Sequence, residues 1–222
     1  MRDLIIFDCD GTLVDTVTDV ARCFNMALAT CGFSQHPIEE YSKFVGGDLE
    51  TVVSKLLPSD SNSSDNINRV KCVYRHIYAE DSKPNTVPFD GMADLLRRLK
   101  LHNILLAVNS NKAQVLTEDV IHKNFPQNLF DSIVAYDEHR PSKPDSYGVK
   151  MICSQCGRKL DSAIYVGDGR SDILTAKHAG IPCVFVTWGQ GNSDDCKDYK
   201  NSLIVNSTLE LERVLMRFCE IR

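Results

Sequence analysis

The sequence predicts a Rossmann-like α/β fold, a doubly wound parallel sheet with a small α-helical domain inserted into it. Short apolar runs recur along the chain, and segments with helical periodicity separate them. Strands that alternate with helices are typical of a parallel sheet with both faces covered. The runs that we expect to form strands are residues 4–7, 104–108, 132–135, 163–166 and 182–186.

Each apolar run is continuous rather than alternating, as is typical of a strand buried on both faces. Before the second run, apolar residues recur within 92–99 at the helical spacing i, i+3, i+4 and i+7. Further helical patterns cover 115–121 and 173–179, and Gly180 after the latter is a favoured helix stop. These patterns predict the α/β alternation.

The interval 16–88 interrupts this alternation, because it contains only helical patterns, at 17–29, 48–57 and 67–79. A polar stretch at 59–65 reads as a loop. Such an interval is too long for one crossover between parallel strands. We therefore expect a catalytic core of residues 1–15 and 89–222, and a helical domain of residues 16–88.

Composition excludes several classes of protein. The 222 residues carry a formal charge of −5, without a run of Lys or Arg, which argues against nucleic acid or a membrane surface as partner. The apolar runs are too short to span a bilayer. The nine cysteines are odd in number and scattered, and no secretory segment is seen at the start, so we expect free thiols and a cytoplasmic protein.

Cys153 and Cys156 form one CxxC pair. A zinc site needs two more ligands, and the six histidines show no metal-ligand spacing. We therefore interpret the pair as part of a helix, although a metal or redox role stays open.

Two carboxylates, Asp8 and Asp10, follow the first predicted strand in the segment FDCDGTLVDT. Being two residues apart, they point to the same side of the sheet, at the strand end where open α/β sheets bind ligands. The alternative is a β-hairpin with Asp10-Gly11 as its turn. A calcium loop is excluded because Gly11 comes too early.

Three further polar clusters each follow a later predicted strand. In NSNK, Ser110 and Asn111 can hold phosphoryl oxygens or simply cap a helix. In RPSKPD, flanking prolines stiffen the loop that presents Lys143, which can also be a solvated lysine. In GDGRSD, Asp168 and Asp172 share one face of an incipient helix, or serve as helix-start acids.

Because the carboxyl ends of parallel strands meet at one edge of a sheet, we expect the four polar clusters to lie close together. If each cluster had its own alternative explanation, their common position after successive strands would be a coincidence. Asp8, Asp10, Asp168 and Asp172 cannot share a pocket with a phosphate dianion unless cations offset the repulsion. Lys143 supplies one positive charge. Oxygen ligands without His or Cys favour Mg²⁺ over zinc.

The set DCDGTLVDT, NSNK, SKP and GDGRSD resembles the haloacid dehalogenase superfamily, in the subgroup whose helical C1-type cap lies between the first two catalytic segments. The opening segment and VTWGQG at 186–191 are similar to those of phosphoglycolate phosphatases. The resemblance covers essentially the whole chain. It implies a Mg²⁺-dependent phosphatase that hydrolyses a small-molecule phosphate monoester through an aspartyl-phosphate, with a cap that closes over the site and selects the leaving group.

The same resemblance implies roles for individual residues. Asp8 is the nucleophile, and Asp10 protonates the leaving oxygen and then activates water. Ser110 bonds a phosphoryl oxygen, and Lys143 neutralises charge. The substrate-binding set is Gly11, Thr12, Ser110, Asn111 and Lys143, and the Mg²⁺ ligands are Asp8, Asp10 through its carbonyl, Asp168 and Asp172.

Other activities on this fold are less consistent with the residues. Dehalogenases lack the acid at the position of Asp10. Mutases similar to β-phosphoglucomutase carry a histidine where this chain has Val20, and an arginine near Gly46, where this chain has none. A non-catalytic binding protein usually loses Asp8, Asp10 or Lys143. A phosphatase is therefore the favoured hypothesis, and a sugar-phosphate mutase and a non-catalytic binding protein are the alternatives.

The identity of the small phosphorylated metabolite stays open, as does the choice between monomer and homodimer. Asp48 in the predicted cap disfavours a carboxylate substrate such as phosphoglycolate if it faces that substrate. We expect instead that Asp48 begins a helix. The basic residues that can offset its charge are Arg22, Lys43 and Lys55.

Overall fold

The computed structural model describes residues 2–220, apart from the side chain of residue 198. The chain forms two compact units. The core unit comprises Met1–Val14 and Pro88–Arg222, and the helical unit comprises Asp15–Val87. Each is described separately. No described helix combines the length and apolar character needed to cross a membrane.

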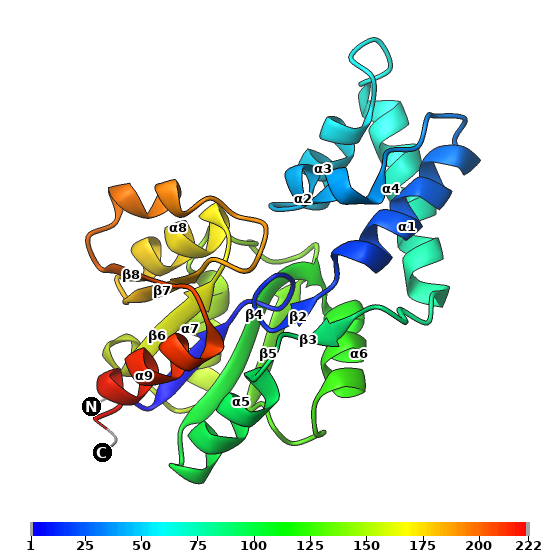
Figure 1. Ribbon diagram of the computed structural model, residues 1–222. Coiled ribbons are helices and arrows are strands. Elements are labelled where there is room, and N and C mark those ends of the chain that lie inside the picture. The colour runs from blue at the N-terminus through cyan, green and yellow to red at the C-terminus, as the bar shows by residue number, and fades with distance from the viewer. Residues whose placement is uncertain (1, 221–222) are drawn as a thin grey trace. The chain divides into compact units, whose positions relative to one another are not determined.

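The core unit contains a six-stranded sheet in the order β5-β4-β1-β6-β7-β8 (Figure 1). All neighbouring strands pair in parallel. The chain builds outward from β1 to β4 and β5, then returns to the other side of β1 for the rest. The predicted α/β fold is confirmed. The strands are β1 (Leu4–Phe7), β4 (Leu105–Ala113), β5 (Ser132–Tyr136), β6 (Ala163–Gly167), β7 (Cys183–Val186) and β8 (Ser202–Val205).

Side-chain alternation along β1 separates two layers of core. Ile5 and Phe7 pack in one cluster, Leu4 and Ile6 in another, and all four are fully buried. The first cluster includes residues of α5 (Met92–Leu101), α6 (Gln114–Asn124) and α9 (Thr208–Phe218). The second includes residues of α7 (Tyr147–Gln155) and α8 (Arg170–Ala179). A central strand buried on both faces explains the unbroken apolar run.

Two features of the core differ from the sequence-based expectation. Strand β4 continues through the polar segment to Ala113, and α6 begins only at Gln114, so Ser110 and Asn111 do not lie at a helix start. Both β8 and α9 were missing from the expected elements. β8 is an edge strand with Leu203 and Ile204 exposed, and its apolar run spans only residues 203–205.

The helical unit contains η1 (Ile38–Glu40) and helices α1 (Val17–Thr30), α2 (Tyr41–Phe44), α3 (Leu49–Leu56) and α4 (Ser64–Glu80). Phe24 and Tyr74 stack with ring centroids 3.8 Å apart, joining α1 to α4. Asp48 begins α3 as expected, because its carboxylate accepts from the Thr51 backbone N–H at 2.8 Å. Where the chain passes between the units, the short strands β2 (Val14–Asp15) and β3 (Val87–Pro88) form a two-stranded sheet.

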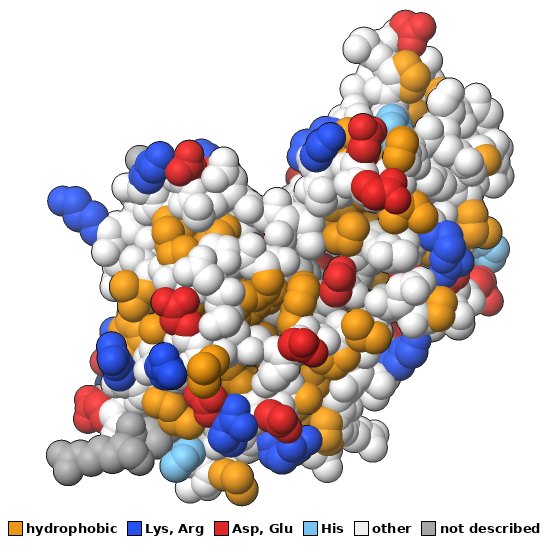
Figure 2. All heavy atoms as spheres, viewed as in Figure 1, with side chains coloured by type: hydrophobic (Ala, Val, Ile, Leu, Met, Phe, Trp, Pro, Cys, Tyr) orange, Lys and Arg blue, Asp and Glu red, His pale blue; other side chains and the backbone are white. Residues whose placement is uncertain are grey.

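Charged side chains on the face shown in Figure 2 are of mixed sign, with basic and acidic groups interspersed. All nine cysteines are free thiols. Cys153 lies buried in α7, and Cys156 is the C-capping residue that follows this helix. The helical position expected from the sequence is thus found for Cys153, whereas Cys156 lies just beyond the helix.

Candidate active site

Asp8 lies directly after β1, at the point where the strand order reverses. β1 pairs with β4 on one side and with β6 on the other, in parallel register. This pairing excludes the hairpin, which requires an antiparallel partner. Open α/β sheets bind ligands beyond the carboxyl ends of their strands at such a switch point. Asp168 follows the neighbouring strand β6, so the topology alone places two acids side by side.

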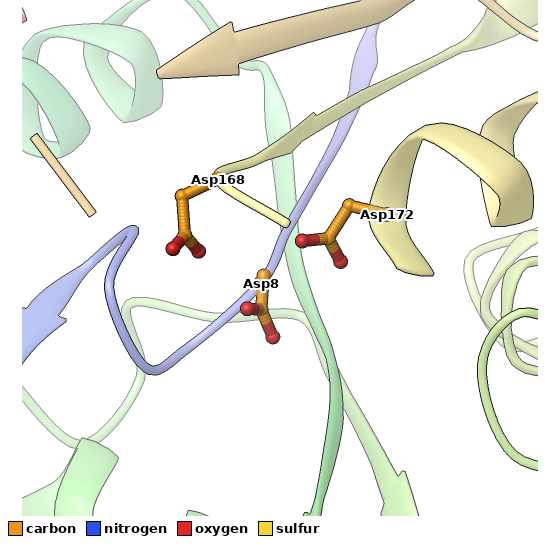
Figure 3. Close-up of side chains that lie close together, drawn as sticks. All are labelled: Asp8, Asp168 and Asp172. Carbon is orange, nitrogen blue, oxygen red and sulfur yellow. The ribbon is translucent and has the colours of Figure 1, made fainter. Parts of the chain in front are cut away.

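Asp8, Asp168 and Asp172 converge from three elements (Figure 3). Asp172 lies in the first turn of α8, and each of the three carboxylates offers an oxygen within 4.8 Å of the others. Their residues are only 8, 5 and 1% exposed. Like charges at such separations repel strongly where water is scarce. The cluster therefore requires positive charge.

Lys143 supplies part of that charge. Its ammonium Nζ donates to Asp8 Oδ1 at 2.6 Å and to Asp172 Oδ1 at 2.7 Å, and its side chain is 3% exposed. The Asn111 side chain holds the lysine backbone in place, because its Oδ1 accepts from Lys143 N at 2.9 Å and its Nδ2 donates to Lys143 O at 3.1 Å. The loop is thus fixed by a residue from β4 as well as by its prolines.

The pKa values follow from burial and charge. Burial, and then the charge of Asp172, raise the pKa of Asp8 well above its usual range, against the opposing effect of Lys143. Burial and the charge of Asp172 raise the pKa of Asp168 to about 6. Burial alone would lower the pKa of Lys143, but the charges of Asp172 and Asp8 outweigh it and the pKa is raised. One ammonium cannot neutralise three buried carboxylates.

These residues fit a hard divalent cation. The three carboxylates offer oxygen donors at close range, which suits Mg²⁺. After burial, the charge of Asp172 is the next largest cause of the raised pKa values of Asp8 and Asp168, and a bound cation would offset that charge. Among the described residues, no other group of three His, Cys, Asp or Glu side chains is close enough to hold an ion.

Asp10 lies apart from this trio, in the turn after β1. Its Oδ1 accepts from Lys112 Nζ at 2.6 Å, and the two side chains are 23 and 9% exposed. Its backbone forms a bridge with Val14. The structure therefore places its carboxylate with a different lysine from the one beside Asp8. Lys112 lies within the NSNK segment, but the sequence alone indicates no role for it.

The other expected substrate-binding residues lie on the same edge. Thr12 donates through its hydroxyl to Asp168 Oδ1 at 3.1 Å. Gly11 adopts φ +80°, and a side chain there would collide with Asp168 and Gln190. The Ser110 hydroxyl is buried and accepts from Lys112 N at 3.1 Å. The four polar clusters identified in the sequence thus meet at one end of the sheet. That Gly11, Thr12, Ser110 and Asn111 contact the substrate stays a prediction.

A glycine-containing loop at 188–191 orients Asp168, a role that sequence reasoning missed. Gln190 N donates to Asp168 Oδ2 at 2.8 Å, and Trp188 Nε1 donates to the Thr12 carbonyl at 3.2 Å. A Cβ on Gly189 or Gly191 would fall well inside van der Waals contact with Asp168. The glycines are the signal that could have revealed this close approach.

Tyr165 is a second contribution that the motifs did not reveal. This buried residue of β6 places its hydroxyl 3.2 Å from Asp172 Oδ1 and 3.2 Å from the Asn109 carbonyl. Asp172 also accepts from the backbone N–H of Gly169 at 2.9 Å. Its carboxylate is therefore held by donors on both oxygens.

Similarity to known proteins extends over most of the chain. A family model described as haloacid dehalogenase-like hydrolase matches residues 5–186. Phosphoglycolate phosphatase 1 of Pseudomonas aeruginosa is 26% identical over 212 residues, which are 94% of this chain and 78% of that protein. The phosphoglycolate phosphatase of Aquifex aeolicus is 29% identical over 186 residues, 84% of this chain and 85% of that protein.

The fold recurs in solved structures. A protein from Lactobacillus delbrueckii subsp. bulgaricus superposes with a TM-score of 0.88 at 24% identity, covering 97% of this chain and 99% of that one. A haloacid dehalogenase-like family hydrolase from Streptococcus pneumoniae gives 0.85 at 24% identity, covering 96 and 98%. At these identities the structures bear on fold alone.

Proposed function

Because this chain belongs to the haloacid dehalogenase-like hydrolase family, we propose that it is a Mg²⁺-dependent phosphatase that hydrolyses a small-molecule phosphate monoester through an aspartyl-phosphate on Asp8. The observation that carries the proposal is the placement of the Asp8 carboxylate. It lies at the sheet's switch point, 2.6 Å from the buried ammonium of Lys143 and close to Asp168 and Asp172.

In the first step, an Asp8 oxygen attacks phosphorus and the bond from phosphorus to the ester oxygen breaks. Asp10 donates its proton to that oxygen, so an alcohol leaves. In the second step, Asp10 takes a proton from water as the water oxygen attacks phosphorus. The bond between phosphorus and Asp8 then breaks, which restores the carboxylate and releases inorganic phosphate.

Lys143 and the hydroxyl of Ser110 would stabilise the charge on the phosphoryl oxygens in both steps. Lys143 is suited to this because its two carboxylate partners hold its ammonium group in place and raise its pKa, against the effect of burial. Asn111 serves the same end indirectly, by holding the Lys143 backbone.

Asp8, Asp168, Asp172 and the Asp10 carbonyl would hold Mg²⁺, which when bound neutralises negative charge on the phosphate and the acids. Formal charges agree with this. Asp8, Asp168 and Asp172 carry three negative charges, and Lys143 returns one positive charge. The remaining two match one divalent cation.

The proposal is tested by hydrolysis of 4-nitrophenyl phosphate by the purified protein, with Mg²⁺ and with EDTA. We expect turnover that requires Mg²⁺ and that is lost in Asp8→Asn, a variant of nearly the same size and shape. Trapping of radioactive phosphate on the wild type but not on Asp8→Asn would support the covalent step. Full activity of Asp8→Asn would exclude it.

A sugar-phosphate mutase is the alternative kept from the sequence. Incubation with β-glucose 1-phosphate separates the two activities, because a phosphatase releases glucose and inorganic phosphate whereas a mutase yields glucose 6-phosphate. We expect free phosphate. The relatives named phosphoglycolate phosphatase support the phosphatase.

A further inference from the structure

We propose that Tyr165 is a positioning residue: its hydroxyl group orients the carboxylate of Asp172, and that carboxylate in turn holds Lys143. The inference rests on the proposed phosphatase function and adds to it a residue outside the four polar clusters. The observation that points to it is a continuous chain of buried hydrogen bonds that begins at Asn109 and ends at Asp8.

Tyr165 approaches the site from the apolar core. It lies in β6 in register with Ile6 of β1, and the two side chains belong to the same buried cluster. Asp8 comes two residues after Ile6, so its side chain points to the same face of the sheet. The tyrosine ring is fully buried, and its hydroxyl group reaches the polar residues at the carboxyl end of the strands.

The hydroxyl group is the middle of the hydrogen-bonded chain. Asn109 Nδ2 donates to the Tyr165 oxygen at 3.3 Å, and the hydroxyl donates to Asp172 Oδ1 at 3.2 Å. The same Asp172 oxygen accepts from Lys143 Nζ at 2.7 Å, and this ammonium group donates to Asp8 Oδ1 at 2.6 Å. None of the five residues is more than 8% exposed. Hydrogen bonds in such a buried chain polarise one another, so a change at the tyrosine is felt at the lysine.

The single proton of the Tyr165 hydroxyl has two acceptors within reach. Asp172 Oδ1 and the Asn109 carbonyl oxygen both lie 3.2 Å from the hydroxyl oxygen. A hydrogen bond to an ionised group is about twice as strong as one to a neutral group, so we expect the proton to point to Asp172. Burial raises the pKa of Tyr165 well above its usual value, and the group therefore keeps this proton at neutral pH.

The fold by itself does not require this hydroxyl group. The buried cluster around the ring is apolar, and a phenylalanine would fill the same space. What the hydroxyl adds is a direction. Asp172 accepts from Lys143 and Tyr165 on Oδ1 and from the Gly169 backbone N–H on Oδ2, and donors on both oxygens fix the plane of the carboxylate. The ammonium group of Lys143 is thereby kept where it meets Asp8.

The test removes only the hydroxyl group, in Tyr165→Phe. We expect kcat for 4-nitrophenyl phosphate at saturating Mg²⁺ to fall about 10-fold, the value of one hydrogen bond to a charged group. KM should change less than about twofold, because the buried hydroxyl acts through Asp172 and does not touch the substrate.

Tyr199→Phe is the matched control. Tyr199 packs against the same apolar cluster as Tyr165, and its hydroxyl donates to the Ile181 carbonyl at 2.6 Å, a contact that involves none of the acids. Its removal should leave kcat and KM as in the wild type. If Tyr165→Phe also left kcat unchanged, the hydroxyl would serve folding only, and the inference would be overturned.

A second measurement needs neither metal nor turnover. In EDTA, Tyr165→Phe should lower the urea midpoint of the wild type, but it should keep less than about half of this effect in Asp172→Ala, because partners in one network are not additive. Tyr199→Phe should have the same effect in both backgrounds. An equal effect of Tyr165→Phe in both backgrounds would mean that the hydroxyl does not act through Asp172, which overturns the inference.

The two measurements also separate this inference from the proposed function. Absence of turnover by the wild type would contradict the phosphatase. The unfolding measurement would still decide whether Tyr165 acts through Asp172.

Discussion

Lys143 Nζ lies 2.6 Å from Asp8 Oδ1, although 135 positions separate the two residues in the chain. The lysine also bonds Asp172, and both ion pairs are almost completely buried. Buried pairs of this kind add little net stability compared with apolar residues, but removing one partner leaves an uncompensated charge. The relationship is thus explained better by catalysis than by folding.

Lys143→Met should therefore damage both activity and stability. We expect kcat to fall about 100- to 1000-fold, as when one charge-stabilising donor is lost, and the metal-free protein to lose about 3–5 kcal/mol. Phosphatase assays and urea denaturation measure the two effects. Lys200→Met, an exposed lysine, is the control. Wild-type activity in Lys143→Met would remove this residue from the mechanism.

Gly189→Ala should weaken the metal site without touching a proposed ligand. The added methyl would overlap the Asp168 carboxylate, so the loop or the acid must move. Disturbing a group that orients a metal ligand typically costs 10- to 100-fold in affinity or activity. We expect the Mg²⁺ concentration for half-maximal activity to rise by about this factor.

Gly157→Ala is the matched control for this change. Gly157 also adopts a left-handed backbone conformation, with φ +63°, but a Cβ added there would contact no atom within 4 Å. It should cost about 1 kcal/mol of stability and leave the Mg²⁺ dependence as in the wild type. Similar Mg²⁺ curves for both alanine variants would show that the loop does not support Asp168.

Mg²⁺ binding should weaken in mild acid. The pKa of Asp168 is raised from 3.8 to about 6 in the metal-free fold, so the folded state holds a proton that the unfolded state has lost between these values. Proton binding by Asp168 therefore stabilises the folded state fully below pH 3.8, and this stabilisation disappears as the pH rises through about 6. A metal ion must displace this proton.

The increase in Tm caused by Mg²⁺ should consequently be larger at pH 8 than at pH 5, with apparent affinity falling up to about tenfold per pH unit below 6. Trp188, the single tryptophan, bonds the Thr12 carbonyl beside Asp168, so its fluorescence gives a second readout. Asp168→Asn should reduce the pH dependence, and Asp8, whose pKa is also raised, should retain part of it. A Mg²⁺ effect that does not vary between pH 5 and 8 would contradict the assignment.

Asp19→Asn should destabilise the helical unit. The fully buried Asp19 carboxylate accepts from Asn85 N and Asn85 Nδ2, both at 2.9 Å, and from Thr86 Oγ1 at 2.8 Å. Burial raises its pKa, but these hydrogen bonds outweigh burial and the pKa is lowered. Its contribution is therefore present above pH 3.8 and lost as the pH falls through the lowered value.

An amide cannot accept all of these bonds, so we expect a loss of about 2–4 kcal/mol at neutral pH. Hydrogen exchange of α1 and of residues 83–87 would locate it. The exposed Glu80→Gln serves as control. If exchange in both segments matched the wild type, Asp19 would not be what holds them together.

Much of the candidate site could be predicted from the sequence, because the positions of its residues depend on where the strands end. Apolar runs identified β1, β4 and β6, and the acids or hydroxyl groups directly after them had to meet at one edge of a parallel sheet. Strand β8 escaped notice because its apolar run, residues 203–205, is only three residues long. NSNK was assigned to a helix start because its polar residues resemble a cap, whereas tertiary pairing keeps them in β4.

The sequence by itself determined the α/β order, the family and the set of residues around Asp8, because these depend on local patterns and on the parallel arrangement of strands. Only the tertiary structure decided which lysine meets which acid, that Asn111 holds Lys143, and that the loop with Gly189 supports Asp168. Side-chain partners depend on the packing of segments far apart in the chain, and no spacing within one segment encodes that.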